Sequence, residues 1–387
     1  EESDSEPKNM VMREINLEQL LHRNSVSLNM DVVENFIKDK VVLVTGGAGS
    51  IGSEICRQVL RFGCKKLVVV DFNENGLFFV DNEFKQNYAG KFVVRLGSIR
   101  DRARITEIFD EFNPEIVFHA AAHKHVPMME INPREAIKNN VMGTVNICEC
   151  VRQNPCVKSF LNVTTDKVYE NKEWEWGYRE NEPLDGYDPY SNSKSCSELV
   201  THSYINSFFQ DRDLAVSTAR AGNVIGGGDF ANDRIIPDCV RAMQKGSSIG
   251  VRNPYSTRPF QHVLEPLGVY LLIAQKQYED KSYAGFYNVG PDECDCVTTG
   301  QLVDLFCKYW GDGAAWENQA EENAPHEANF LKLDCSKVKR VFGWAPRWHI
   351  EECMDMTCRF SKEWLTGGDI PAEMDREIEA FYAQKES

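Results

Sequence analysis

The sequence predicts an α/β protein with a doubly wound parallel sheet of the Rossmann type and a smaller C-terminal lobe. Three observations support this fold class. An apolar run at residues 41–44 leads directly into a glycine-rich turn and then a helical pattern. Apolar runs and helical patterns alternate from there to residue 220. The chain has 387 residues, 42% of them hydrophobic, which is enough to bury a sizeable core.

The elements follow one another in βαβ order. Short continuous apolar runs are typical of parallel strands buried on both faces, and they predict strands at residues 41–44, 66–70, 92–94, 116–119, 159–163 and 215–220. Helical patterns between them predict helices at residues 54–62, 105–112, 133–152 and 191–209. Beyond residue 222 the elements shorten and prolines are more frequent, with an apolar helix expected at 263–275.

This texture divides the chain into three parts. Residues 1–39 form an acidic, polar lead with an amphipathic stretch at 17–36, expected to pack on the main body as a docking arm. Residues 40–222 form the Rossmann lobe, which carries the catalytic residues. Residues 223–387 form the smaller substrate lobe, with interleaved contributions to the site.

Charge and composition exclude several function classes. With 43 Lys and Arg against 59 Asp and Glu, the net charge of −16 argues against a main role on nucleic acid or an anionic membrane. No apolar run approaches the roughly 20 residues of a membrane span, and we expect a cytoplasmic protein without an export signal. Thirteen scattered cysteines predict reduced thiols rather than disulfides. Their C-x-C pairs lack the spacing of a zinc site, so no metal is expected.

The glycine turn predicts a dinucleotide site. Glycines let the backbone approach a pyrophosphate, whose charge meets the amides of the helix N-terminus. Asp71 ends the second strand, where a carboxylate can accept both ribose hydroxyls and repel a 2′-phosphate, which favours NAD over NADP. A glycine turn without a ligand is the alternative. The residues predicted to line this part of the site are Gly46, Gly49, Ser50, Ile51, Gly52 and Asp71.

Two motifs carry the predicted chemistry. Tyr190 and Lys194 form a Y-x-x-x-K pair, and residues four apart share one face of a helix. An adjacent ammonium stabilises the phenolate, so Tyr190 can accept the proton of a sugar hydroxyl while hydride leaves for NAD. Thr165, Asp166 and Lys167 follow a strand at its carboxyl end. An acid and a base beside a hydroxyl suit a β-elimination, and a surface ion pair is the alternative reading.

The turn Gly46-x-x-Gly49-x-x-Gly52 resembles that of the extended short-chain dehydrogenase/reductase superfamily, whose members act on nucleotide sugars. By this resemblance further residues contact the cofactor: Ser98 and Ile99 near the adenine, Ala120, Ala121 and Ala122 along the dinucleotide, Asn140, and the pair Tyr190 and Lys194. Ser98 stands where the family usually has Asp. Helices of this family usually pair with those of a partner subunit, which implies a homodimer or homotetramer.

The set Thr-Asp-Lys followed by Tyr-x-x-x-Lys resembles the nucleotide-sugar 4,6-dehydratases. The resemblance implies that Thr165 orients the 4-hydroxyl and that Asp166 is the general acid for water loss. Lys167 takes the place of the usual Glu as the base at C5. Tyr190 and Lys194 drive oxidation at C4, and the hydride finally returns to C6. A simple 4-epimerase or a net-oxidising dehydrogenase on the same scaffold, or a non-catalytic NAD-binding scaffold, are the alternatives.

The C-terminal half of the chain indicates which nucleotide the sugar substrate carries. Segments 173–190, 220–229, 233–237, 258–263 and 326–334 resemble the CDP-glucose 4,6-dehydratases. By this resemblance Arg234 and Arg258 are phosphate ligands, because guanidinium pairs bidentately with phosphate. A solvated surface charge is the alternative for each. The other candidate substrate contacts are Lys124, Glu180, Asn223 and His326.

The N-terminal half of the chain indicates a different nucleotide sugar. Residues 17–40, 49–54 and 123–139 resemble the UDP-N-acetylglucosamine 4,6-dehydratases, whose long members have a membrane-anchored part and usually carry Met at the position of Tyr190. Lys124 then contacts sugar or diphosphate, or supports the site indirectly. Because the C-terminal lobe selects the nucleotide, the sequence favours CDP-glucose, with UDP-N-acetylglucosamine as the runner-up.

Overall fold

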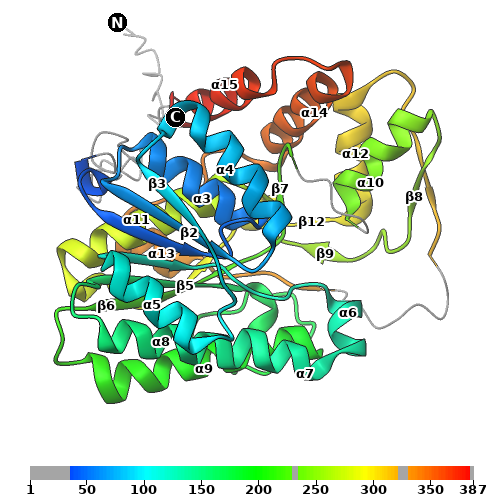
Figure 1. The fold of residues 1–387 in the computed structure, drawn as a ribbon. Helices are drawn as coiled ribbons and strands as arrows, with labels where there is room; N and C mark the ends of the chain where they lie inside the picture. Colours follow the sequence, from blue (N-terminus) through cyan, green and yellow to red (C-terminus); the bar gives the residue numbers. More distant parts are fainter. Residues whose placement is uncertain (1–34, 229–233, 321–329, 384–387) are drawn as a thin grey trace, which may run out of the picture.

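The computed structural model describes residues 35–228, 234–320 and 330–383 (Figure 1). Seven strands form one sheet in the order β11-β6-β5-β4-β1-β2-β3, and every pairing is parallel. The predicted doubly wound sheet is therefore confirmed. The strands are β1 (Val41–Thr45), β2 (Lys66–Asp71), β3 (Phe92–Leu96), β4 (Ile116–His119), β5 (Ser159–Thr165), β6 (Ala215–Ala221) and β11 (Phe286–Val289).

Helices cover both faces of the sheet. In Figure 1, α3, α4 and α11 lie above the sheet and α5, α8 and α9 below it. Successive strand residues point to opposite faces, so Val42 and Val44 join one core cluster while Leu43 joins the other. These six helices are α3 (Ser50–Arg61), α4 (Glu74–Tyr88), α5 (Arg102–Phe112), α8 (Gly143–Gln153), α9 (Pro189–Tyr204) and α11 (Leu264–Glu279).

Two of the predicted helices are not continuous. The one expected at 133–152 divides into α7 (Pro133–Ala136), a π-helical turn (Ile137–Met142) and α8. The one expected at 191–209 begins at Pro189 as α9 and ends in a second π turn (Ile205–Phe209). Such turns insert one residue into the helical ladder, and hydrophobic periodicity over a whole helix does not register them.

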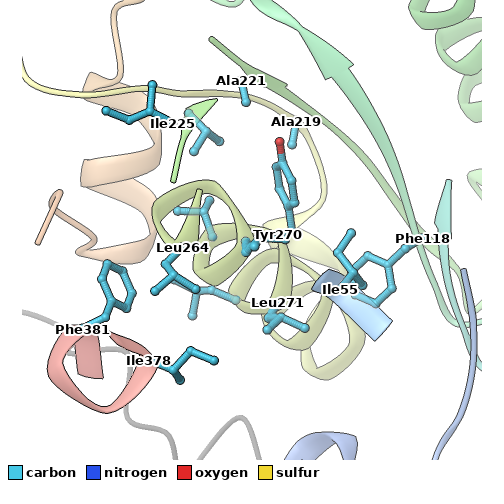
Figure 2. Close-up of a cluster of buried hydrophobic side chains, with 14 of the residues drawn as sticks. Ile55, Phe118, Ala219, Ala221, Ile225, Leu264, Tyr270, Leu271, Ile378 and Phe381 are labelled. Atoms are coloured by element: carbon cyan, nitrogen blue, oxygen red, sulfur yellow. The ribbon is translucent and has the colours of Figure 1, made fainter. Parts of the chain in front are cut away.

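The C-terminal part of the chain contributes a strand and a helix to the main sheet. Strand β11 pairs with β6, and α11 packs on β5 and β6. Figure 2 shows Tyr270 reaching from α11 toward Ala219 of β6. The predicted boundary at residue 222 falls one residue after β6 ends, and the division into lobes stays a prediction.

The remaining elements include six helices and three pairs of short strands. The helices are α6 (Val126–Ile131), α10 (Ile235–Lys245), α12 (Thr299–Trp310), α13 (Ser336–Phe342), α14 (Ile350–Thr366) and α15 (Ile370–Ala383). The strands pair as β7 (Val224–Ile225) with β10 (Gln261–His262), β9 (Thr257–Arg258) with β12 (Val297–Thr298), and β8 (Ile249–Val251) with β13 (Trp316–Asn318).

Of the predicted docking arm, residues 1–34 lie outside the described residues. Phe36 and Ile37, which follow, are buried in the core cluster that contains α3 and α11. Within the described residues, no helix combines the length and the apolar composition needed to cross a bilayer.

Candidate active site

The glycine turn between β1 and α3 packs backbone against backbone. Gly46 has φ +71°, and a Cβ there would lie 2.6 Å from the backbone nitrogen of Ala121. A Cβ on Gly52 would lie 2.0 Å from the carbonyl oxygen of Gly46. Gly49 precedes α3, and no side chain of the described part caps the helix. The amides at Ser50 and Ile51 are thus left for an anion, and this cradle fits a pyrophosphate.

Asp71 lies at the end of β2, directly beside the glycine turn. Its Oδ2 accepts a hydrogen bond from the Ala48 amide at 3.0 Å, and its Oδ1 accepts one from the Asn73 amide at 2.9 Å. A carboxylate has about four acceptor sites, so two remain for ribose hydroxyls. The position fits the predicted contact with NAD.

The segment at Ser98 and Ile99 is held from below by a residue that sequence reasoning missed. Asn146 on α8 donates hydrogen bonds to the carbonyl oxygens of Ile99 at 2.8 Å and of Arg100 at 3.1 Å. Gly143 lets Ile99 pack closely, since a Cβ there would lie 2.4 Å from the Ile99 Cδ1 atom. The adenine-side wall of the predicted site is therefore fixed by α8.

Asn140 lies in the π turn and links two parts of the site. Its side chain accepts a hydrogen bond from the His123 amide at 2.8 Å and donates to the His123 carbonyl at 2.9 Å. It also donates to Ser193 Oγ on α9 at 2.9 Å. Asn140 thus ties the segment after Ala120, Ala121 and Ala122 to the helix that carries Tyr190 and Lys194.

Three of the catalytic candidates, Thr165, Asp166 and Lys167, lie together at the carboxyl end of β5. Thr165 Oγ1 donates to Asp166 Oδ1 at 2.9 Å, and the Lys167 ammonium lies 3.8 Å from the same oxygen. Asp166 is fully buried, whereas the Lys167 side chain is 37% exposed. The alternative interpretation, in which Asp166 belongs to a surface ion pair, is therefore excluded because this carboxylate is buried.

The second oxygen of Asp166 has no hydrogen-bond partner among the described residues. It faces Gly222, where a Cβ would lie 3.3 Å from Oδ2. Buried acceptors are nearly always paired, and an unpaired one at the carboxyl end of a strand is typical of a group that meets a ligand. Sequence reasoning did not single out Gly222, because only the fold brings it beside Asp166.

Tyr190 is the second residue of α9, and Asp188 caps this helix. The Asp188 carboxylate accepts from the amides of Tyr190 at 2.9 Å and Ser191 at 3.0 Å. Burial raises the pKa of the Tyr190 phenol above its usual value, and the Asp166 and Asp188 carboxylates act in the same direction. A hydrogen bond with Thr165 and the charge of Arg234 oppose this rise. Tyr190 therefore lies close to Thr165, Asp166 and Arg234, so the two sequence motifs meet at one place.

Lys194 is buried one turn further along α9. Its ammonium donates to the Val163 carbonyl at 3.0 Å. Burial lowers the pKa of this ammonium to about 8, while the Glu198 carboxylate opposes the shift. The Lys194 ammonium is thus held against the end of β5, and its pairing with Tyr190 stays a prediction.

Three of the predicted substrate residues lie in segments that follow β6. Arg234 ends the segment before α10 and is close enough to Tyr190 to oppose the rise in its pKa. Arg258 on β9 is buried, and its Nη1 donates to the Thr257 carbonyl at 3.0 Å. The Asn223 carbonyl accepts from the Gln261 amide at 3.0 Å, which fixes the backbone where β7 begins.

The other predicted substrate residues are placed differently. Lys124 is exposed before α6. The Glu180 carboxylate accepts from the Asn288 amide at 2.9 Å, and burial raises its pKa, so it supports β11. His326 lies outside the described residues. The substrate roles of all six residues stay predictions.

One group of side chains has the composition of a metal site. The ligand atoms of Cys294, Asp295 and His349 lie within 4.8 Å of one another. Asp295 accepts from the Ile350 amide at 3.1 Å and is 2.8 Å from His349 Nδ1, so it caps α14. These hydrogen bonds account for the group without an ion, and the expectation of no metal stays a prediction.

Sequence comparison relates the chain to enzymes of sugar metabolism. The family model described as "Polysaccharide biosynthesis protein" matches residues 42–282. A CDP-glucose 4,6-dehydratase of Salmonella typhimurium is 42% identical over 358 residues, which cover 90% of this chain and 98% of that protein. The capsular polysaccharide biosynthesis protein CapD of Staphylococcus aureus is 33% identical over 257 residues, 66% of this chain and 39% of CapD.

Solved structures share the fold. A dTDP-glucose 4,6-dehydratase from Streptomyces venezuelae, solved with NAD bound, has a TM-score of 0.71 and 23% identity and covers 85% of this chain and 99% of its own. A UDP-glucose 4-epimerase from Thermotoga maritima has a TM-score of 0.72 and 22% identity, with 84% and 99% covered. Both the dehydratase and the epimerase scaffold therefore match the architecture seen here.

Proposed function

Because this chain belongs to the polysaccharide biosynthesis family and, within it, to the nucleotide-sugar 4,6-dehydratases, we propose that it converts CDP-glucose to CDP-4-keto-6-deoxyglucose with bound NAD. The observation that carries the proposal is the buried Asp166, whose Oδ2 lies unpaired among the described residues. Its neighbours Thr165, Lys167 and Tyr190 are the groups that such an elimination uses. The 42% identity to a CDP-glucose 4,6-dehydratase supports the choice of nucleotide.

When bound, NAD would supply a reversible acceptor for the hydride that leaves C4 and later adds at C6. The glycine cradle at Gly46 and Gly52, together with Asp71, fits this cofactor. Solved relatives of the same fold that contain NAD support the assignment.

The residues of the chain carry the proton transfers. Tyr190 takes the proton of the C4 hydroxyl, with Thr165 orienting that hydroxyl and Lys194 stabilising the phenolate. The C4 ketone acidifies the C5 proton, which Lys167 removes as the general base. Asp166 donates its proton to the C6 hydroxyl, which leaves as water. A proton then returns to C5 as hydride returns to C6, so the net change is the loss of one water.

In this proposal, residues near the carboxyl ends of the strands bind the substrate. Arg234 and Arg258 are our candidates for the diphosphate, since guanidinium pairs bidentately with phosphate oxygens. Asn223, Glu180, Lys124 and His326 are the candidates for the sugar and base.

Mass spectrometry tests the proposal directly. Incubation with CDP-glucose and NAD is expected to give a product lighter by one water, and Tyr190→Phe is expected to slow its formation by roughly 10²–10⁴-fold. Intact CDP-glucose would overturn the choice of substrate. A product of unchanged mass but altered stereochemistry, or accumulated NADH, would replace the dehydratase with an epimerase or a net dehydrogenase.

UDP-N-acetylglucosamine is the second candidate substrate. The segment 123–139 favours it, and in the structure this segment lies against α9 through the contacts of Asn140. The same assay with that sugar nucleotide decides between the two, because one of them should lose water at least tenfold faster. Cytoplasmic location and a homodimer or homotetramer remain part of the proposal.

A further inference from the structure

Below the catalytic pair lies a fully buried ion pair that the proposed mechanism does not use. Arg220 on β6 and Glu198 on α9 both have side chains with 0% exposure. Arg220 Nε lies 2.8 Å from Glu198 Oε1 and 2.9 Å from Oε2, and a second guanidinium nitrogen also donates to Oε2. Such fork-like pairing is the strongest geometry for this kind of contact.

The Glu198 carboxylate also binds two neighbouring strands of the sheet, β5 and β6. Thr164 Oγ1 of β5 donates to Oε1, and Thr218 Oγ1 of β6 donates to Oε2 at 3.1 Å. Thr164 directly precedes Thr165 and Asp166. Glu198 therefore joins α9 to the strand end that carries the acid.

Arg220 extends the network away from the pair. Its Nη1 donates to Tyr169 Oη at 2.8 Å and to the Glu180 carbonyl at 3.0 Å. Tyr169 in turn donates to Asn288 Oδ1 of β11 at 2.6 Å. The arginine is thus fixed by neutral acceptors on its other side, and this orients it toward Glu198.

Glu198 lies four residues after Lys194, so the two side chains share one face of α9. Lys194 is only 3% exposed, and its ammonium donates to the neutral Val163 carbonyl. A buried ammonium is costly without a nearby negative charge. The Glu198 carboxylate opposes the lowering of the Lys194 pKa by burial, and the other titratable group near this ammonium is the buried imidazole of His119 on β4, whose pKa Lys194 lowers.

We propose that Glu198 is a positioning residue: anchored by Arg220, Thr164 and Thr218, its carboxylate keeps the buried Lys194 charged beside Tyr190. This inference rests on the proposed function for its effect on turnover, because Lys194 matters to the reaction only as the partner of Tyr190. The charge of Lys194 itself is measurable without substrate or cofactor.

The test is a titration of Lys194 in the full chain labelled with [ε-¹³C]lysine, with its signal assigned by Lys194→Arg. The wild-type midpoint is expected near pH 8. Glu198→Gln, which keeps the shape but removes the charge, is expected to lower the midpoint by about one pH unit. The single variant leaves the Arg220 guanidinium buried without its carboxylate partner. The double variant Glu198→Gln/Arg220→Met removes this unpaired charge as well, and the titration of Lys194 is repeated with it.

Glu265→Gln is the matched control, since Glu265 is an equally buried glutamate on α11 that does not act on Lys194. It is expected to leave the midpoint unchanged. A midpoint unmoved in both Glu198 variants, or an equal shift in Glu265→Gln, would overturn the inference.

The alkaline fall in the rate of CDP-glucose dehydration provides the second readout. If Lys194 must be charged, this fall moves to lower pH by the same amount in the Glu198 variants. Turnover that vanishes uniformly at all pH values, with an unmoved midpoint, would show a structural role and overturn the inference. A wild type without any turnover refutes the proposed function, while the titration still decides the role of Glu198.

Discussion

At the scale of single residues, burial decides which candidates can do chemistry. Asp166 and Lys167 are adjacent in sequence, yet one is fully buried and the other more than a third exposed. The difference arises because β5 ends at Thr165 and the following 3-10 turn (Asp166–Val168) directs Asp166 into the protein. This single turn thus buries the carboxyl that we propose as the acid and leaves the proposed base, Lys167, partly exposed.

Asp166→Asn tests the role of the acid. Asn is isosteric and can keep the contact with Thr165, so the fold should survive, but it cannot donate the proton that water loss requires. We expect dehydration of CDP-glucose to fall by roughly 10²–10⁴-fold, with NADH absorbance accumulating because C4 oxidation remains possible. Dehydration at the wild-type rate would exclude Asp166 as the acid.

A buried carboxyl outside the site gives the protein a pH-dependent stability. Burial raises the pKa of Glu265 to about 7 from 4.5. Its Oε1 accepts from the amides of Arg347 at 2.7 Å and Trp348 at 2.8 Å. Between these pH values the unfolded chain loses the proton and the folded chain keeps it, so the free energy of unfolding decreases as pH rises.

Glu265→Gln removes this dependence. The variant should match the wild type near pH 4.5 and be more stable than it above pH 7, by about 3 kcal/mol at most. Thermal melts of both proteins at several pH values measure the difference. A stability gap that stays constant from pH 5 to pH 8 would contradict the prediction.

At the scale of elements, the interrupted helix shows what periodicity misses. The π turn at Ile137–Met142 lies within what reads as one helix, and both Asn139 and Asn140 in it are buried. In an uninterrupted α-helix the side chains after residue 137 would have a different rotation about the helix axis. Asn140 would then not contact both His123 and Ser193. The sequence predicted the helix correctly but not the turn, because the contacts that stabilise it lie 17 and 53 residues away.

Two glycine variants separate the effect of backbone strain at a positive φ from the effect of a steric clash in the glycine turn. Gly46→Ala meets both a positive φ and a backbone atom at 2.6 Å. Gly63→Ala has nearly the same φ, +74°, with nothing within 4 Å, and should cost only about 1 kcal/mol of backbone strain.

We therefore expect Gly46→Ala to weaken NAD binding at least tenfold in a fluorescence titration, and Gly63→Ala to leave it unchanged. Equal NAD affinity in the two variants would mean that the close approach at Gly46 does not shape the cofactor site.

At the scale of the whole molecule, an acidic chain concentrates positive charge at one place. The net charge is −16, yet Lys194, Arg234 and the open N-terminus of α3 are all assigned to the one site at the carboxyl ends of the strands. Because a diphosphate and a dinucleotide are both anionic, this local concentration is a condition of the proposed function.

The face formed by α9 and the π turn at Ile137–Met142 is expected to bind a second copy of the chain. Three apolar side chains there are at least half exposed: Ile137, Met142 and Leu199. Leu199→Glu should shift the protein toward a monomer in light scattering, because it places a charge in an apolar interface. Phe79→Glu, on α4 across the sheet (Figure 1), is the control and should leave the mass unchanged. A wild-type monomer at micromolar concentration would refute the prediction.

The sequence by itself determined the βαβ order, the glycine turn, the Tyr190–Lys194 spacing and the Thr165–Asp166–Lys167 motif, because each depends on residues close together in the chain. Only the tertiary structure decided that β11 extends the sheet, that Gly222 faces the unpaired oxygen of Asp166, and that Arg220 and Glu198 form a buried pair beneath Lys194. These contacts join segments that lie far apart in sequence, and their energies depend on burial, which local patterns do not contain.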